Sequence, residues 1–282
     1  MQFTNKDVCA VIISYNPDEA IIQNVKSLLP QVGQIHIYDN GSGADSREIL
    51  ESLEKNEKII VTFCDDNTGI AGRLTQAVTE SEGYSLILTM DQDTILEKNC
   101  VSQMVEVLNK DSRIVSVGPN RKSLRNRKGY VLTDYLITSG NLLVVEKLKP
   151  IHAYWELLFI DLVDIEASLF LRSKGYKLAI ATKAHMEHKV GEYEESKFLK
   201  HRFLSHSVHR FRYMFRNFIL VERLYAKYFP IFCMKLAFFQ FIKLLRISLE
   251  TNRRMKLKAA LQGVREGLRM NTNERKQDIR AN

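Results

Sequence analysis

Short apolar runs recur between residues 8 and 190, and most of them end at a cluster of polar residues. Such runs are typical of strands buried in a sheet, and the segments between them have the three- and four-residue apolar spacing of amphipathic helices. We predict strands at residues 8–14, 34–38, 59–64, 86–90, 114–118, 142–145, 155–160 and 178–180, and helices at residues 18–29, 45–55, 70–81, 99–108 and 164–174. This alternation predicts an α/β fold, with a parallel sheet covered by helices on both faces.

The strand at residues 86–90 leads directly into Asp91-Gln92-Asp93. In sheets of this kind, ligands bind at the carboxyl ends of the strands. Two carboxylates one residue apart repel each other, so the pair favours a divalent cation that also holds a phosphate. An acidic turn without a ligand is the alternative for this tripeptide alone.

Three other strands also end in polar residues, and these ends are expected at the same edge of the sheet. They are Tyr15-Asn16-Pro17, the turn at residues 39–43 and the turn at residues 65–69. Neither a Gly-x-Gly-x-x-Gly turn nor a Walker lysine loop follows the first strand, which argues against a dinucleotide oxidoreductase and a P-loop enzyme. This edge of the sheet is therefore expected to bind a different ligand.

Three features further along have both a structural and a functional interpretation. The loop at residues 121–128 contains five Lys or Arg, which fits either a solvated loop or a flap that meets an anionic ligand. Asp164 fits either a helix cap or an active-site carboxylate. His188 fits either a surface histidine or a metal ligand.

The two parts of the chain differ strongly in charge. Residues 197–282 contain 20 Lys and Arg against 5 Asp and Glu, whereas residues 1–196 contain 21 against 28. The C-terminal part also interleaves Phe with Lys and Arg at helical spacing. We therefore predict a domain at residues 1–195 and a basic amphipathic helical region at residues 196–282. That region either packs on the first domain or lies on an anionic bilayer, and RNA binding, the third possibility, lacks a nucleic-acid motif.

Composition narrows the class of protein further. Of the 282 residues, 45% are hydrophobic and 26% charged, which is ordinary for a globular protein and excludes wholesale disorder. The four cysteines lie far apart, and this spacing favours free buried thiols over disulfides or a zinc site. Residues 1–7 are polar and form no signal peptide, so we expect a cytosolic protein. The longest apolar tract, residues 228–242, is interrupted by Lys235 and is short for a membrane span.

Together these motifs resemble those of the inverting GT-A glycosyltransferases of family two, and most closely the bacterial rhamnosyltransferases. The resemblance covers residues 8–191 and extends more weakly to residues 210–217 and 263–267. Seven motifs in the family's order carry it: Ile13-Ser14-Tyr15-Asn16-Pro17, Asp39-Asn40-Gly41-Ser42, Asn67-Thr68-Gly69-Ile70-Ala71, Asp91-Gln92-Asp93, Ser139-Gly140-Asn141, residues 159–166 and His188-Lys189-Val190-Gly191. It implies a GT-A catalytic domain with a Rossmann-like nucleotide-binding sheet.

The resemblance also implies a role for each motif on the donor side. A nucleotide-sugar donor, dTDP-L-rhamnose in the rhamnosyltransferase branch, would contact a set of six residues, with Asp39 accepting the pyrimidine N–H. A Mg²⁺ or Mn²⁺ ion would neutralise the departing diphosphate. The donor set is Tyr15, Asn16, Asp39, Asn67, Gly69 and Asp91, and the metal set is Asp91, Asp93 and His188.

On the acceptor side, the resemblance implies that Asp164 is the general base that deprotonates the attacking hydroxyl. The acceptor would be a polyprenyl-diphosphate-linked glycan of the O-antigen or capsule type at the cytosolic face of the bacterial inner membrane. It would contact Ser139, Gly140, Trp155, Asp161 and Glu166. A UDP-hexose or UDP-galactofuranose donor, a nucleotidyltransferase and a non-catalytic membrane-associated scaffold remain alternatives.

Overall fold

The computed structural model describes residues 2–121, 124, 126, 128–188, 193–195, 202–204 and 207–281, with the backbone alone at residues 188, 193–195, 202–204 and 249. Its internal contacts divide the chain into two compact units. The first contains residues 1–157 and 167–189, and the second contains residues 158–166 and 190–282. Residues 158–166 thus belong with the C-terminal helices, although they precede the boundary predicted at residue 195.

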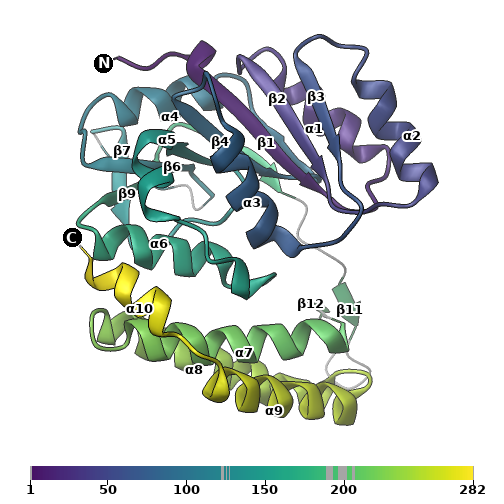
Figure 1. The fold of residues 1–282 in the computed structure, drawn as a ribbon, viewed down its shortest axis with the longest axis vertical. Helices are drawn as coiled ribbons and strands as arrows, with labels where there is room; N and C mark the ends of the chain where they lie inside the picture. The colour runs from purple at the N-terminus through teal and green to yellow at the C-terminus, as the bar shows by residue number, and fades with distance from the viewer. Residues whose placement is uncertain are drawn as a thin grey trace. The chain divides into compact units, whose positions relative to one another are not determined.

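The first unit is built on an eight-stranded sheet with the order β3-β2-β1-β4-β8-β6-β9-β7 (Figure 1). Strands β1 to β4 are mutually parallel, as predicted, and β6 and β9 also pair in parallel. Strands β8 and β7 run antiparallel to their neighbours, so the sheet is mixed and not wholly parallel. The strands are β1 (Val8–Ser14), β2 (Gln34–Asp39), β3 (Ile59–Phe63), β4 (Leu86–Asp91), β6 (Ile114–Pro119), β7 (Tyr130–Thr133), β8 (Asn141–Val144) and β9 (Lys177–Ala181).

Helices flank the sheet on both faces, which gives the predicted α/β class (Figure 1). Strand β4 shows why these residues form the centre of the sheet, because every residue from Leu86 to Met90 is almost completely buried. A strand covered on both faces needs such a continuous apolar run. The helices of this unit are α1 (Ala20–Leu28), α2 (Ala44–Leu53), α3 (Gly69–Glu80), α4 (Cys100–Leu108), α5 (Val145–Leu148) and most of α6 (Val163–Ser173).

A small two-stranded sheet, absent from the sequence predictions, brings distant segments together. Strand β5 (Thr94–Leu96) pairs antiparallel with β10 (Met186–His188), and His188 is the partner of Thr94. Each strand has only three residues, which is too short to produce a recognisable alternation in the sequence. The pairing places the backbone of His188 beside the residue that follows Asp93.

The strand predicted at residues 155–160 is wrong. This segment contains a short 3-10 helix (Glu156–Leu158), followed by residues with positive φ at Phe159, Asp161 and Leu162. Left-handed conformations cannot continue a strand, and they are costly for residues other than glycine. The aromatic and apolar composition that favoured a strand instead serves to anchor an irregular loop.

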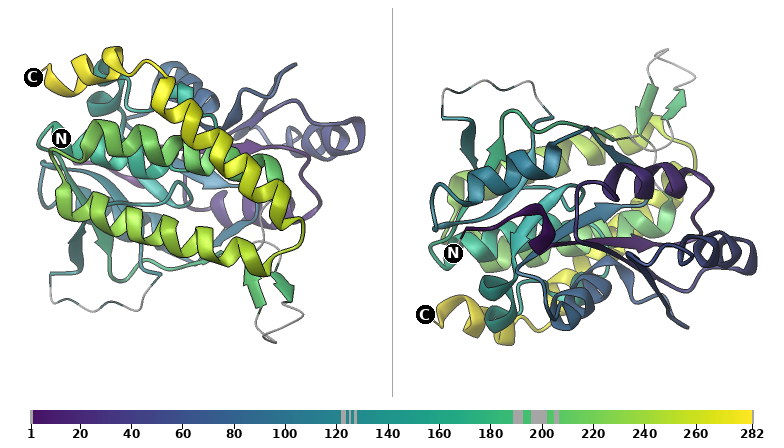
Figure 2. Two further views of the ribbon diagram at one scale, coloured as in Figure 1. Left: turned by 90° about the horizontal axis from the view of Figure 1, so that it is seen from below. Right: turned by 90° about the horizontal axis from the view of Figure 1, so that it is seen from above.

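The second unit is helical. Its long helices are α7 (Val208–Tyr225), α8 (Pro230–Arg246) and α9 (Arg253–Arg269), followed by the shorter α10 (Asn273–Arg280) (Figure 2). Helices α7 and α9 pack closely because Gly263 and Gly267 lie against the α7 backbone, where a Cβ on Gly263 would approach Arg212 O within 2.2 Å. The hairpin of β11 (Tyr193–Glu195) and β12 (Arg202–Leu204) precedes these helices.

Candidate active site

Asp91 and Asp93 lie at the carboxyl end of β4, where both are partly exposed. Two buried side chains hold the backbone around them. Ser139 Oγ accepts the Asp91 N–H at 3.1 Å, and Asn24 Nδ2 donates to the carbonyl oxygens of Asp91 at 2.8 Å and Thr94 at 2.6 Å. The acidic tripeptide is therefore fixed by neighbouring elements and is not a loose surface turn.

Gln92, the middle residue of the tripeptide, connects the ends of β4 and β1. Its Oε1 accepts the Tyr15 N–H at 2.9 Å, while the Tyr15 side chain remains 51% exposed. Asn16, in the left-handed region at φ 46°, accepts the Gly43 N–H at 3.0 Å through Oδ1. The first strand end thus presents an aromatic ring to solvent on a backbone held from two sides.

Asp39 is more enclosed than the sequence indicates. The Ser42 hydroxyl donates to Asp39 Oδ1, and the Ser42 N–H donates to Oδ2 at 3.1 Å. The Asp39 side chain has no exposed surface. Contact between this carboxylate and a pyrimidine would therefore require the turn at residues 40–43 to open.

Asn67 and Gly69 lie in a network centred on Asn40. Asn67 Oδ1 accepts the Gly69 N–H at 2.9 Å and an Asn40 amide hydrogen at 3.0 Å. Asn40 Oδ1 in turn accepts from Thr68 N–H and from Arg73 Nε, each at 3.0 Å. The network places a nearly buried guanidinium in the first turns of α3, at the edge where an anionic donor is expected.

The metal ligands predicted at this edge come from two segments. Asp91 and Asp93 lie at the end of β4, and the backbone of His188 lies beside Thr94, although the His188 side chain is outside the described residues. Among the side chains that are described, no group of three His, Cys, Asp or Glu forms a preassembled metal site. Two carboxylates nevertheless match the ligand set of Mg²⁺, which usually combines one or two carboxylates with substrate phosphates and water.

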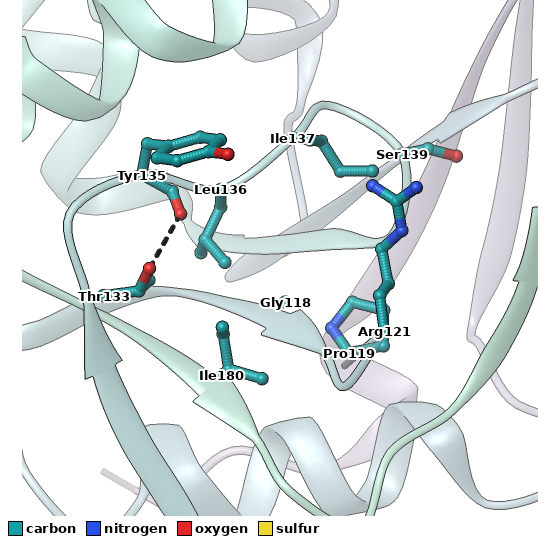
Figure 3. Close-up of a pocket in the computed structure, with 9 residues that line it drawn as sticks. All are labelled: Gly118, Pro119, Arg121, Thr133, Tyr135, Leu136, Ile137, Ser139 and Ile180. Atoms are coloured by element: carbon teal, nitrogen blue, oxygen red, sulfur yellow. Dashed lines mark hydrogen bonds between the residues drawn. The ribbon is translucent and has the colours of Figure 1, made fainter. Parts of the chain in front are cut away.

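A cavity of about 270 Å³ lies beside this edge, lined by the ends of β6 and β9 and by the segment before β8 (Figure 3). Its walls are mostly apolar, with the Arg121 guanidinium directed towards the side that carries Ser139. Gly140 follows at φ 77°, where a Cβ would approach Met186 Sδ within 2.9 Å. Ser139, Gly140 and the partly exposed Trp155, all predicted acceptor contacts, belong to this first unit.

In the second unit, α7 holds the irregular loop that precedes Asp164. Asn217 is fully buried, and its amide donates to the carbonyl oxygens of Leu158, Ile160 and Asp161 at 2.7 to 2.9 Å. Arg210 pairs with both oxygens of Asp161 at 3.0 and 3.1 Å. Non-glycine residues in left-handed conformations persist only where their surroundings enforce them, and such residues cluster at functional sites.

Asp164 lies in the first turn of α6, where its Oδ1 accepts the N–H of Ile165 at 2.8 Å. The helix-cap interpretation of this residue is wrong, because α6 already begins at Val163 and Asp164 is its second residue. Its catalytic role stays a prediction.

Glu166 differs from its predicted acceptor-binding role. The side chain is fully buried, and Arg275 pairs with both of its oxygens at 2.8 and 2.9 Å. The Tyr225 hydroxyl donates to Oε1 at 2.6 Å, and burial together with the Glu166 charge raises the pKa of Tyr225. Glu166 therefore has a structural function, which joins the first turn of α6 to α7 and α10.

Six residues that organise these sites received no individual role from the sequence, although Asn40 and Gln92 stand inside the family motifs. They are Asn24, Asn40, Arg73, Gln92, Asn217 and Arg275. Most are buried polar residues on helices or turns, and each of the six has a partner between 27 and 109 positions away. A polar residue on the apolar side of a helix was the available signal: Asn24 follows Ile21 by three residues and precedes Leu28 by four.

Comparison with known proteins now decides the family. Residues 9–160 match the family described as glycosyl transferase family 2. The chain belongs to glycosyl transferase family 2. Its mixed sheet with flanking helices has the GT-A fold predicted from the sequence.

Curated relatives in this family match part of the chain. Poly-beta-1,6-N-acetyl-D-glucosamine synthase of Staphylococcus aureus (strain COL) is 26% identical over 120 residues, which cover 42% of this chain and 29% of that protein. Hyaluronan synthase of Streptococcus pyogenes is 29% identical over 136 residues, covering 45% and 32% respectively. The matched region thus spans less than a third of the length of either relative.

Two solved structures resemble the fold. GalNAc-T7, crystallised with UDP, GalNAc and Mn²⁺, matches with a TM-score of 0.65 at 12% identity. The match covers 80% of this chain and 49% of the GalNAc-T7 chain. S. aureus TarS 1-349 has a TM-score of 0.56 at 15% identity and covers 93% and 81% respectively. At these identities the likeness concerns the fold alone.

Proposed function

We propose that the protein is a metal-dependent inverting glycosyltransferase that uses a nucleotide-sugar donor. The observation that supports it best is the fixed Asp91-Gln92-Asp93 turn, braced by Ser139 and Asn24 and tied to Tyr15, in a chain of glycosyl transferase family 2. Two carboxylates on a braced backbone at the carboxyl edge of the sheet suit a metal-bound diphosphate.

The proposed donor contacts surround this turn. Tyr15 would stack on the base, with Asn16, Asn67 and Gly69 close to the nucleoside and Asp91 near the ribose. Asp39 would contact the pyrimidine only when the turn at residues 40–43 opens, because its carboxylate is enclosed by Ser42. The motifs of the rhamnosyltransferase branch favour dTDP-L-rhamnose, and a UDP-hexose or UDP-galactofuranose is the alternative donor.

We propose Mg²⁺ or Mn²⁺ as the cofactor, held by Asp93 and Asp91 with His188 as a further ligand. The residues fit, since an oxygen-rich pair leaves coordination positions for the diphosphate and the His188 backbone lies beside Thr94. When bound, the ion would neutralise negative charge on the leaving nucleoside diphosphate. Arg73, fixed by Asn40, would add positive charge at the same edge.

On the acceptor side, we propose that Asp164 takes the proton of the attacking hydroxyl, which gives inversion when attack comes from the face opposite the diphosphate. Ser139, Gly140, Trp155 and Asp161 are the proposed acceptor contacts. The acceptor would be a polyprenyl-diphosphate-linked glycan, as in O-antigen or capsule synthesis, reached from the cytosolic face of a bacterial inner membrane. Within the described residues, no helix combines the length and apolarity that a membrane crossing requires.

Calorimetric titration of dTDP and UDP, with and without Mn²⁺, tests the donor site. We expect nucleotide binding that requires Mn²⁺. The variant Asp93→Asn should bind the nucleotide more weakly in the presence of Mn²⁺, because one coordinating charge is removed. Asp111→Asn is the matched control, because this carboxylate instead pairs with Arg113 at 3.1 Å on the surface. A wild-type protein that binds neither nucleotide under any condition would favour a non-catalytic scaffold.

A further inference from the structure

Helix α8 turns its apolar side towards solvent. Five large side chains at alternating three- and four-residue spacing form one stripe along it, and each is more than half exposed: Ile231 (65%), Met234 (68%), Phe238 (61%), Phe241 (55%) and Leu245 (54%). The opposite side, with Cys233, Leu236 and Gln240, is the buried one. A surface helix of a soluble protein normally has the reverse arrangement.

Helix α9 repeats this arrangement. Leu257, Leu261 and Leu268 are exposed along one stripe at the spacing of helical turns. Its buried side contains Lys256, paired with Glu250 at 2.7 Å, and the small residues Ala259, Ala260, Gly263 and Gly267, of which the glycines lie against the α7 backbone. Both helices pack on α7 and belong to the same unit (Figure 2).

The charges beside these stripes are positive. Exposed cations flank the leucines of α9 on one side of the helix, and Lys235 and Arg246 flank the stripe of α8 in the same way. Helix α8 contains no Asp or Glu, and the one acid of α9, Glu266, pairs with Arg212 at 2.7 Å. The cations that flank the leucines of α9 are Arg254, Lys258, Arg265 and Arg269. Arg253 is also exposed at the start of the helix, and Lys256 is buried in an ion pair with Glu250.

We propose that the α8–α9 surface, defined by these apolar stripes and their flanking cations, lies on an anionic lipid bilayer with α8 parallel to the membrane plane. Phenylalanine and leucine would enter the acyl boundary while Lys and Arg contact the phosphates, the arrangement of an interfacial amphipathic helix. Each basic residue near an anionic surface adds about 1 kcal/mol of attraction. The inference rests on the membrane location in the proposed function, and it does not depend on the sugar chemistry.

A bilayer fits this surface better than a second copy of the chain would. Two copies joined by α8–α9 would bring both sets of cations together without acids to neutralise them. Anionic phosphates supply the missing charge, and an acyl boundary accepts side chains of any shape. Exposed apolar area of this extent on a helical face is itself a mark of an interaction site.

Vesicle flotation of the full chain tests the proposal. The protein should float with phosphatidylethanolamine–phosphatidylglycerol vesicles at low salt, float less at high salt, and float least with phosphatidylcholine alone. Phe238→Ser/Phe241→Ser should lower the bound fraction by at least about tenfold, because two apolar side chains lose their burial in lipid. Leu132→Ser is the matched control, since this 56% exposed leucine lies on β7 and should leave flotation unchanged.

Charge is tested separately. The double variant Arg254→Gln/Arg265→Gln should float with anionic vesicles almost as weakly as with neutral ones. The control Lys26→Gln/Lys58→Gln, which removes two exposed cations of the first unit, should keep the wild-type preference for anionic vesicles. A Phe238→Trp variant, which retains the apolar stripe, should show fluorescence quenching by brominated lipids. This readout decides the question even where a serine variant does not fold.

Three results would overturn the proposal. The first is no flotation of the wild-type chain with anionic vesicles, and the second is no quenching of Phe238→Trp by brominated lipids. The third is a concentration-dependent dimer in sedimentation that Phe238→Ser abolishes, in a protein that does not float. The last would assign the surface to a second copy. Metal-dependent binding of dTDP and UDP is measured by calorimetry on the same samples, because the donor site needs neither acceptor nor vesicles. Flotation without nucleotide binding refutes the donor site alone, and nucleotide binding without flotation refutes the membrane surface alone.

Discussion

At the scale of single residues, Asp164 follows a loop whose backbone α7 holds in left-handed conformations. If it is the general base, Asp164→Asn should lower the transfer rate by about 10²- to 10⁴-fold, because an amide cannot accept the proton. Nucleotide binding should be nearly unchanged. Steady-state rates combined with calorimetric titration of the nucleoside diphosphate check this prediction, and transfer at the wild-type rate would refute the assignment.

His36 gives the folded protein a defined pH dependence. Burial lowers its pKa below the ordinary 6.5, so the folded protein holds the ring neutral, with Nε2 at 2.7 Å from Thr62 Oγ1. Below about pH 6.5 the unfolded chain binds a proton that the folded chain resists, so stability should fall as the pH falls. Urea unfolding at pH 7.5 and 5.5 should show a smaller loss for His36→Gln than for the wild-type protein. An equal loss in both would show that His36 does not contribute.

Single residues were also where prediction from sequence was most uneven. Asp91 and Asp93 were recognisable because an apolar run ends at them. Gln92 and Asn24 were not, because their partners are backbone atoms 67 to 77 residues away. The family resemblance implies that Glu166 contacts the acceptor, and nothing in the sequence indicates that Arg275, 109 residues later, neutralises it in the core.

At the scale of elements, a buried ion pair joins α10 to α6. Arg275→Met should lower the free energy of unfolding by about 3 to 5 kcal/mol, because it leaves the Glu166 carboxylate buried without its cation. Arg275→Met/Glu166→Leu should recover much of that loss, since no uncompensated charge then remains. Chemical denaturation of the three proteins measures the difference, and equal stability of the single and double variants would contradict this explanation.

Prediction of elements succeeded where periodicity is long and local. Strands β1 to β4 and their helices follow from segments of five to seven residues, mostly apolar, that lie between turn signals. It failed for β5 and β10, which have three residues each, and for the four-residue strand β7, none of which was predicted. It also failed for residues 155–160, where contacts from Asn217 override the apparent strand pattern. The antiparallel direction of β7 and β8 depends on long-range pairing, which periodicity does not encode.

At the scale of the whole molecule, the acidic and basic parts of the sequence correspond to the two compact units of the structure. The acidic part forms the α/β unit with the proposed donor edge, and the basic part forms the helical unit with the exposed α8 stripe. The sequence predicted this amphipathic pattern but not its direction. Only the structure shows that the apolar side of α8 faces solvent, because an amphipathic sequence is the same whichever way the helix packs.

The most direct measurement is a donor screen that follows release of nucleoside diphosphate, with Mn²⁺ present or removed by a chelator. We expect turnover of one nucleotide sugar, with dTDP-L-rhamnose first among the candidates and UDP-linked sugars second. Chelation should stop the reaction, and restored Mn²⁺ or Mg²⁺ should recover it. Failure of every dTDP- and UDP-sugar to release its nucleotide, with vesicles bearing a polyprenyl-diphosphate glycan supplied as acceptor, would contradict the proposed glycosyltransferase activity.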